Sequence, residues 1–179
     1  MKENPNSKRG VKRFALMAIT LSIALTAVGC KGPRPVFLSI QATDEATRLS
    51  IPVYVGPANQ LYDKGLLEEN VDTWLNNSSK SAVELKSFRL ATMGTNNVIR
   101  KDDPIWEIWR GQKKADHVVV IADLPRNRGS FGDSRNDKRR IAVPLERKLW
   151  REGVGKSLKK PVVVEIRAEE LKLITQPGR

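Results

Sequence analysis

The segment His117-Val118-Val119-Val120-Ile121-Ala122 decides the fold, because it is the most apolar strand-like run after residue 30. Valine and isoleucine branch at Cβ and favour extended backbone. An apolar run of this length without polar alternation is typical of a strand with both faces buried. The sequence therefore predicts that this segment is a central strand of a sheet.

Shorter strand patterns lie on both sides of this segment. Turn-forming residues separate them rather than long amphipathic helices, and this disfavours a doubly wound α/β fold. We therefore expect an all-β fold, a two-sheet β-sandwich of transthyretin-like type with one short helical insertion. The expected strands cover residues 36–42, 49–55, 83–91, 105–109, 117–122, 140–145, 162–168 and 170–175.

Local features refine two of these strands and one connection. Pro52 lacks an amide hydrogen, which predicts that the strand over 49–55 lies at a sheet edge or carries a bulge. The apolar face changes within the strand over 83–91, which predicts a bulge at Lys86-Ser87. Residues 126–137 are polar and contain glycine, so we expect an exposed loop there.

The helical insertion is expected between the second and third strands. Apolar residues recur at near-helical spacing over 61–75, and Asn70 is placed to cap a helical turn. We predict one or two helical turns over 65–76. On an extended strand Trp106 and Trp109 would face opposite sides, so we expect one to fill the core and the other to be exposed as a candidate partner contact.

The first 29 residues have the features of an export signal. The run from Phe14 to Val28 is apolar and uncharged over 15 residues. A helix that spans a bilayer needs about 20 residues, so this run fits a cleaved secretory signal peptide. No later stretch predicts a transmembrane helix. The leader before the run is basic at Lys2, Lys8, Arg9, Lys12 and Arg13.

Cys30 is the only cysteine of the chain, and it follows Leu25-Thr26-Ala27-Val28-Gly29. This segment resembles a bacterial lipobox, which implies cleavage between Gly29 and Cys30 and lipid modification of the cysteine. A single cysteine has no disulfide partner in its chain, so no structural role competes for the thiol. The alternative is an ordinary secretory signal in which the cysteine happens to fall at this place.

The lipobox divides the chain into three parts. We expect a signal peptide over 1–29, the lipidated cysteine with a short tether over 30–35, and a β-sandwich domain over 36–179. Several acyl chains on one cysteine anchor a protein durably, at about 0.8 kcal/mol per buried CH₂. Lys31 follows the cysteine in place of the Asp that retains enterobacterial lipoproteins in the inner membrane. The resemblance therefore implies a lipid-anchored protein of the outer membrane that faces the periplasm.

The positive charge is concentrated in one segment. Residues 124–160 hold 12 Lys and Arg against 4 Asp and Glu, whereas residues 30–123 hold 12 of each. Such a block attracts acidic proteins, anionic lipids or nucleic acid, but an exported protein with few aromatic residues there is not expected to bind nucleic acid. The alternative is a solvated basic loop that binds nothing. Our candidate partner-binding residues are Arg126, Arg128, Arg139, Arg140, Arg147 and Lys148, together with Trp109.

Signatures of catalysis and of nucleotide binding are missing from the sequence. The single histidine excludes a metal motif with two histidines. Asp116 and His117 are neighbours that would face opposite sides of a strand, so strand-end capping by His117 is the better interpretation. We therefore expect a protein that is not an enzyme and that has no cofactor, metal or small-molecule substrate.

Beyond the lipobox, the chain resembles the outer-membrane lipoprotein family of type VI secretion systems, called TssJ. The similar features are Ile51 to Val55 followed by 61–75, the apolar strand Val118 to Ala122, and the final strands over 162–166 and 171–174. The resemblance implies a non-enzymatic anchor whose domain docks a large inner-membrane protein that crosses the periplasm.

Two functional hypotheses follow. The first is a docking or structural component of an envelope or type VI secretion complex, with a protein partner in the envelope and the bilayer bound through Cys30. The second is a lipoprotein that binds an anionic envelope polymer or lipid, such as wall glycan or lipid A, through residues 124–160.

Overall fold

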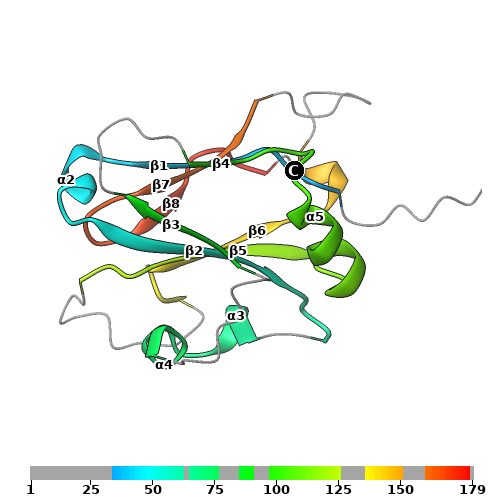
Figure 1. Ribbon diagram of the computed structural model, residues 1–179, viewed down its shortest axis with the longest axis horizontal. Coiled ribbons are helices and arrows are strands. Elements are labelled where there is room, and N and C mark those ends of the chain that lie inside the picture. Colours follow the sequence, from blue (N-terminus) through cyan, green and yellow to red (C-terminus); the bar gives the residue numbers. More distant parts are fainter. Residues whose placement is uncertain are drawn as a thin grey trace, which may run out of the picture. The chain divides into compact units, whose positions relative to one another are not determined.

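The structure is a computed structural model and describes residues 34–62, 65–76, 85–90, 97–125, 136–150 and 160–177. Within these ranges the chain forms two four-stranded sheets, ordered β4-β1-β7-β8 and β3-β2-β5-β6 (Figure 1). The predicted all-β two-sheet sandwich is confirmed. The predicted signal peptide, the Gly29-Cys30 cleavage site and the tether residues before Arg34 lie outside the described residues.

The sheets are built from short strands, and most pairs are antiparallel. The first sheet consists of β1 (Leu38–Ala42), β4 (Asn97–Ile99), β7 (Val162–Ile166) and β8 (Leu171–Leu173). The second consists of β2 (Ile51–Ala58), β3 (Lys86–Leu90), β5 (His117–Ala122) and β6 (Arg140–Pro144). Only β1 and β7 pair in parallel among the described strands.

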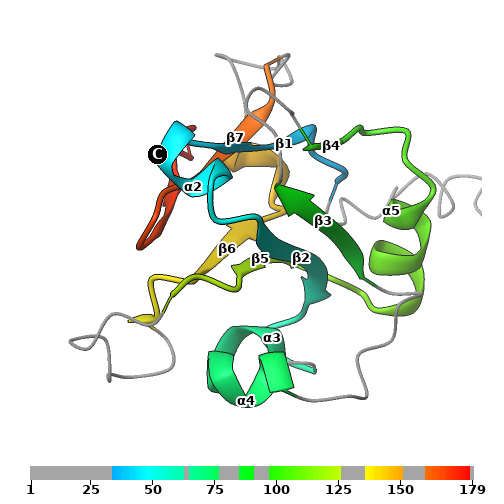
Figure 2. The same ribbon diagram turned by 60° about the vertical axis from the view of Figure 1, so that its left-hand side comes forward.

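The helical elements are short and connect the strands. They are α2 (Asp44–Thr47), α3 (Gly65–Glu68), α4 (Val71–Asn76), α5 (Ile105–Glu107), the π-helical η3 (Ile108–Gln112) and the 3₁₀-helical η5 (Arg147–Leu149). Figure 2 shows α3 and α4 on the outer face of the second sheet, on the side away from the first sheet. Among the described residues, no helix is long and apolar enough to cross a membrane.

Strand β5 is central, as predicted, because it lies between β2 and β6. Val118, Val120 and Ala122 enter the core between the two sheets. Val119 and Ile121 face the other way and pack in a second cluster with residues of the α3–α4 segment. Because both faces of the strand are covered by apolar side chains, its sequence has no polar alternation.

Strand β2 is also internal, so the predicted edge position is wrong. Pro52 is tolerated because the ladder with β5 ends beside it. The last register pair is Val53 with Ala122, and the Pro52 carbonyl then accepts a hydrogen bond of 2.9 Å from the Asp123 amide. The missing amide hydrogen of the proline therefore falls beyond the last register pair with β5, while Pro52 keeps its register opposite Arg89 of β3.

The predicted bulge at Lys86-Ser87 is also wrong. Lys86 pairs with Val55 and Ser87 pairs with Tyr54, and the register continues without an inserted residue. The strand β4 over 97–99 was not predicted, because three residues are too few for a period-2 pattern.

Residues 105–112 form α5 and η3, so the predicted strand over 105–109 is wrong. The Asp103 carboxylate accepts a 3.0 Å hydrogen bond from the Ile105 amide, and Pro104 stands at the helix start. An acidic residue followed by proline is a helix-start signal, and here it prevails over the strand propensity of the aromatic residues.

The helix also corrects the prediction for the tryptophans. Trp106 and Trp109 are 2% and 0% exposed, and their rings meet edge to face at 5.2 Å. Three residues apart on a helix, they share one side instead of facing opposite ways. Trp109 is therefore a core residue and is not available as the exposed partner contact that was predicted.

Candidate functional site

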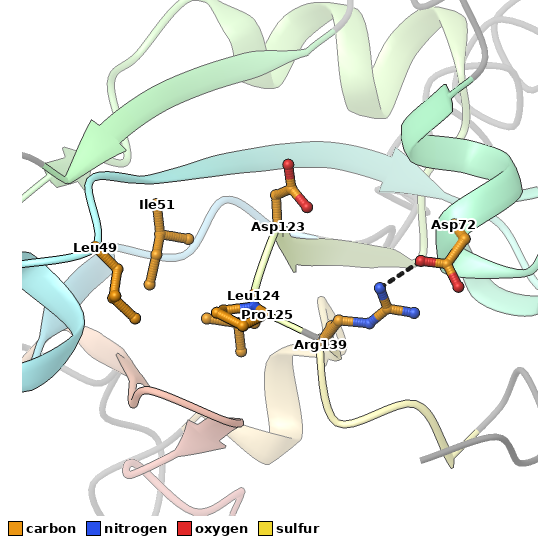
Figure 3. A pocket seen from close by; sticks show the side chains of 7 residues that line it. All are labelled: Leu49, Ile51, Asp72, Asp123, Leu124, Pro125 and Arg139. Atoms are coloured by element: carbon orange, nitrogen blue, oxygen red, sulfur yellow. Dashed lines mark hydrogen bonds and ion pairs between the residues drawn. The ribbon is translucent and has the colours of Figure 1, made fainter. Parts of the chain in front are cut away.

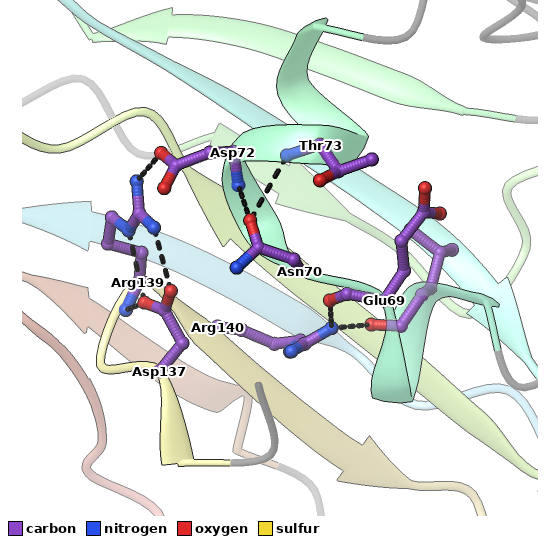
Figure 4. A network of polar contacts seen from close by, with 8 residues as sticks. Glu69, Asn70, Asp72, Thr73, Asp137, Arg139 and Arg140 are labelled. Atoms are coloured by element: carbon purple, nitrogen blue, oxygen red, sulfur yellow. Dashed lines mark hydrogen bonds and ion pairs between the residues drawn. The ribbon is translucent and has the colours of Figure 1, made fainter. Parts of the chain in front are cut away.

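The strongest polar cluster of the described residues surrounds Arg139, which lies just before β6. Its Nε and Nη2 donate to Oδ1 and Oδ2 of Asp137 at 3.0 and 2.7 Å, and its Nη1 donates to Asp72 at 2.6 Å (Figure 4). The side chains of Arg139 and Asp137 are 11% and 8% exposed. Arg139 therefore ties the loop before β6 to helix α4, which carries Asp72.

The charges of this cluster support each other. Hydrogen bonds to Asp137 and Asp72 raise the pKa of Arg139 despite its burial. Burial alone pushes the pKa of Asp137 upward. Two effects outweigh burial: hydrogen bonds from the side chain and backbone of Arg139, and the positive charges of Arg139 and Arg140. The pKa of Asp137 is therefore lowered from its ordinary value of 3.8. The cluster thus keeps its ion pairs at neutral pH.

Arg140 is the next residue and the first of β6, and its side chain binds the α3–α4 segment. Its Nη1 donates to the carbonyl oxygens of Leu66 and Glu69, both at 2.9 Å (Figure 4). A guanidinium group at this place satisfies carbonyls that a short helix leaves without partners. Burial is the main reason that the pKa of Arg140 lies below its usual value.

Helix α4 begins as predicted. The Asn70 side-chain oxygen accepts hydrogen bonds from the amides of Asp72 and Thr73 at 2.9 and 3.2 Å, so Asn70 caps the helix. The predicted helical turns over 65–76 are confirmed as α3 and α4. The cap, Arg139 and Arg140 together hold the segment against the sheet.

A pocket of about 380 Å³ opens beside Arg139, at the start of β2 and the end of β5. Its apolar lining comes from Leu49, Ile51, Leu124 and Pro125, and its polar lining from Asp72, Asp123 and Arg139 (Figure 3). The guanidinium group of Arg139 is already bound to two carboxylates, so it has little capacity left for an anion.

Among the predicted partner-binding residues that the structure describes, Arg139, Arg140 and Trp109 are buried and Lys148 is exposed. Arg139 and Arg140 are each 9% exposed and make internal contacts, which the sequence did not reveal. Lys148 is exposed and pairs with Glu146 at 3.0 Å. Arg147 lies in η5, and its side chain is outside the description, as are Arg126 and Arg128 entirely.

Asp116 and His117 do contact each other, although the sequence predicted that they point apart. The His117 ring Nδ1 lies 2.8 Å from an Asp116 carboxylate oxygen. Asp116 precedes β5, so the alternation of a strand does not apply to it. Both carboxylate oxygens of Asp116 also lie 3.2 Å from the Gln60 amide, which makes the carboxylate a structural acceptor for the turn after β2.

Comparison with known proteins gives little further information. The sequence matches no protein-family model and no curated protein. A solved chain described as "Type VI membrane complex" is similar, with a TM-score of 0.46 and 13% identity, over 80% of this chain and 99% of that chain.

Proposed function

We propose that this chain is an exported lipoprotein whose β-sandwich domain docks a protein partner in the cell envelope, and that it is not an enzyme. The observation that carries the proposal is the position of the only cysteine. Cys30 directly follows a 15-residue apolar run and Gly29, and it precedes the first described residue of the domain, Arg34, by four positions. A lipid on Cys30 would hold the domain close to a bilayer.

Docking is preferred to catalysis because two of the three polar side chains that line the pocket, those of Asp72 and Arg139, bind each other. Asp72 and Asp137 bind Arg139, and the remaining carboxylate, that of Asp123, lies in an exposed residue. A general acid or base needs a pKa near the working pH, whereas the pKa of the buried Asp137 is lowered.

In its finer form, the proposal is a TssJ-like role in a type VI secretion complex. The domain would lie on the periplasmic side of the outer membrane. It would bind a large inner-membrane protein that crosses the periplasm. The support is the resemblance in sequence over Ile51 to Val55, 61–75 and Val118 to Ala122.

The burial of Arg139 and Arg140 changes which cations can take part in docking. Lys138 and Lys148 are 67% and 68% exposed, and each makes a surface ion pair that contributes about 0–1 kcal/mol. Such charges exchange partners easily and raise the rate of capture of an acidic protein. We therefore place the electrostatic part of docking on the exposed lysines of 124–160.

The test is affinity capture of the full-length lipidated protein from detergent-solubilised membranes, with Cys30→Ser as the control. Mass spectrometry identifies the partners and reports whether Cys30 is acylated. An inner-membrane protein with a large periplasmic domain, captured by the wild type, supports the proposal. An unmodified Cys30 contradicts the anchor, and capture of glycan or anionic lipid alone favours the polymer-binding alternative.

Charge reversal locates the docking surface. Lys138→Glu with Lys148→Glu should weaken capture and reduce its dependence on salt. Lys172→Glu is the matched control, because Lys172 is an exposed lysine on β8 outside the basic segment. Equal capture by both variants would show that the basic segment is not used.

A further inference from the structure

Two adjacent apolar side chains stand in solvent at the turn that follows β2. Leu61 and Tyr62 are 79% and 78% exposed, more than any other large apolar side chain of the described residues. Single exposed apolar residues are common on protein surfaces. A neighbouring pair at the tip of one turn is a feature that needs a reason.

The turn is held in place by a buried side chain. Asn59 is only 6% exposed, and its Oδ1 accepts hydrogen bonds from the amides of Leu61 and Tyr62 at 2.9 and 3.1 Å. The Asn59 Nδ2 donates to the Lys114 carbonyl in the connection before β5. A turn fixed on both sides presents its two apolar side chains in a defined position.

A cation accompanies the aromatic ring. The Nζ of Lys114 lies 6.0 Å from the centroid of the Tyr62 ring, and Lys114 adopts a positive φ of 49°. A non-glycine residue rarely takes this conformation, and the surrounding contacts must hold it there. Tyrosine, leucine and lysine together are the residue types that occupy the boundary between lipid head groups and acyl chains.

The turn lies at the same end of the domain as Arg34, the first described residue. A series of backbone hydrogen bonds connects the two: Arg34 donates to Leu145 at 3.2 Å, Leu145 to Asp116 at 2.8 Å, and Asp116 to Ala58 at 3.1 Å. Neighbouring backbones in such a series are about 5 Å apart. Ala58 is the last residue of β2 and directly precedes the turn.

The short chain between Cys30 and Arg34 limits the distance between a lipid on Cys30 and the end of the domain that carries the turn. Arg34 follows Cys30 by four positions, and a fully extended chain of that length spans about 14 Å. Arg34 itself is exposed, so it adds a second cation to this end. A bilayer is therefore the surface that the tether brings to the turn.

We propose that the Leu61-Tyr62 turn is a second membrane contact, at which both side chains enter the lipid interface and Lys114 approaches a lipid phosphate. The inference rests on the lipidation of Cys30 in the proposed function. The contact would fix the orientation of the domain on the bilayer, whereas a lipid anchor at Cys30 alone does not determine that orientation.

The test places a probe on the turn of the full-length, acylated protein. Acylation occupies the thiol of Cys30, the only cysteine, so Tyr62→Cys supplies one free thiol for a fluorophore. The control is Glu45→Cys, an exposed residue of α2, which Figure 1 shows at the end of the sheets opposite α5. Both proteins are reconstituted into vesicles of phosphatidylethanolamine and phosphatidylglycerol with a spin-labelled lipid as quencher.

The expected result is at least twofold quenching of the probe at position 62 and no quenching at position 45. Leu61→Ser combined with Lys114→Glu should reduce the quenching at position 62. Leu49→Ser should leave it unchanged, because Leu49 is an exposed leucine two positions before β2. Circular dichroism checks that each variant is folded.

The other outcomes separate the inference from the proposed function. If mass spectrometry shows acylated Cys30 but the probe at position 62 is quenched no more than that at 45, the membrane contact is refuted and the lipoprotein assignment stands. An unmodified Cys30 contradicts both the membrane contact and the lipoprotein assignment. Shielding of the probe by a captured envelope protein, without quenching by lipid, identifies the turn as a protein contact and also overturns the inference.

Discussion

Replacement of Arg139 by methionine is the sharpest test of the polar cluster. The change keeps much of the aliphatic stem but leaves Asp137, whose side chain is 8% exposed, without its partner. Breaking a buried ion pair from one side costs about 3–5 kcal/mol. Water still reaches Asp72, which is 32% exposed, so we expect the lower limit of about 3 kcal/mol.

The assay is urea unfolding of the purified protein, followed by tryptophan fluorescence. All four tryptophans are less than 9% exposed, so unfolding changes the signal strongly. With a slope of about 2 kcal/mol per molar urea, the midpoint should fall by about 1.5 M. Asp137→Asn added to Arg139→Met should restore part of the loss, because the buried uncompensated charge is then gone.

The matched control is Lys138→Met, one position earlier. Lys138 is 67% exposed and lies 3.9 Å from Glu170. Such a pair contributes about 0–1 kcal/mol, so its midpoint should stay close to that of the wild type. Equal midpoints for Arg139→Met and Lys138→Met would refute the argument that the cluster holds α4 against the sheet.

Three further predictions concern pH, the cap of α4 and the core. The pKa of Asp137 is lowered from 3.8 in the folded state, so the ionised carboxylate stabilises the fold fully above pH 3.8. This contribution to the free energy of unfolding is lost as the pH falls through the lower folded pKa. Unfolding curves measured at several pH values should show the loss in the wild type and not in Asp137→Asn. Asn70→Ala should reduce the free energy of unfolding by about 1 kcal/mol, whereas Asn70→Asp should not, because aspartate also caps helices. Hydrogen exchange of the amides over 71–76 measures fraying of α4. Equal exchange rates in the two variants would contradict the capping role of Asn70. Trp109→Ala should lower the free energy of unfolding by about 3–5 kcal/mol and abolish the near-UV circular dichroism of the paired rings. A variant that stays stable and loses only partner capture would show instead that Trp109 contacts the partner.

The sequence predicted those elements whose signal is local. The central strand over 117–122 was predictable because burial on two faces removes polar residues from the strand itself. The cap at Asn70 was predictable because the capping residue adjoins the helix that it caps. Residues 105–109 show the weakness of propensity alone, since the preceding Asp103-Pro104 determined a helix where aromatic residues favoured a strand.

The polar cluster could not be predicted because its members come from distant parts of the chain. Arg139 and Asp72 are 67 positions apart, and Arg140 and Leu66 are 74 apart. Lysines and arginines in a basic segment are read as solvated unless the fold supplies partners. Only the spacing of Asp137 and Arg139, two residues apart, gave a local signal for the pair.

The parallel pairing of β1 with β7 has a consequence for the order in which the domain can form. Leu38 pairs with Val162, so strand β1 needs a partner that is synthesised 124 residues later. Closing a loop of this length carries an entropic cost, and such non-local pairing slows folding. Until β7 is available, one edge of β1 stays open to other chains. The first sheet therefore reaches its final strand order only after most of the domain has been synthesised.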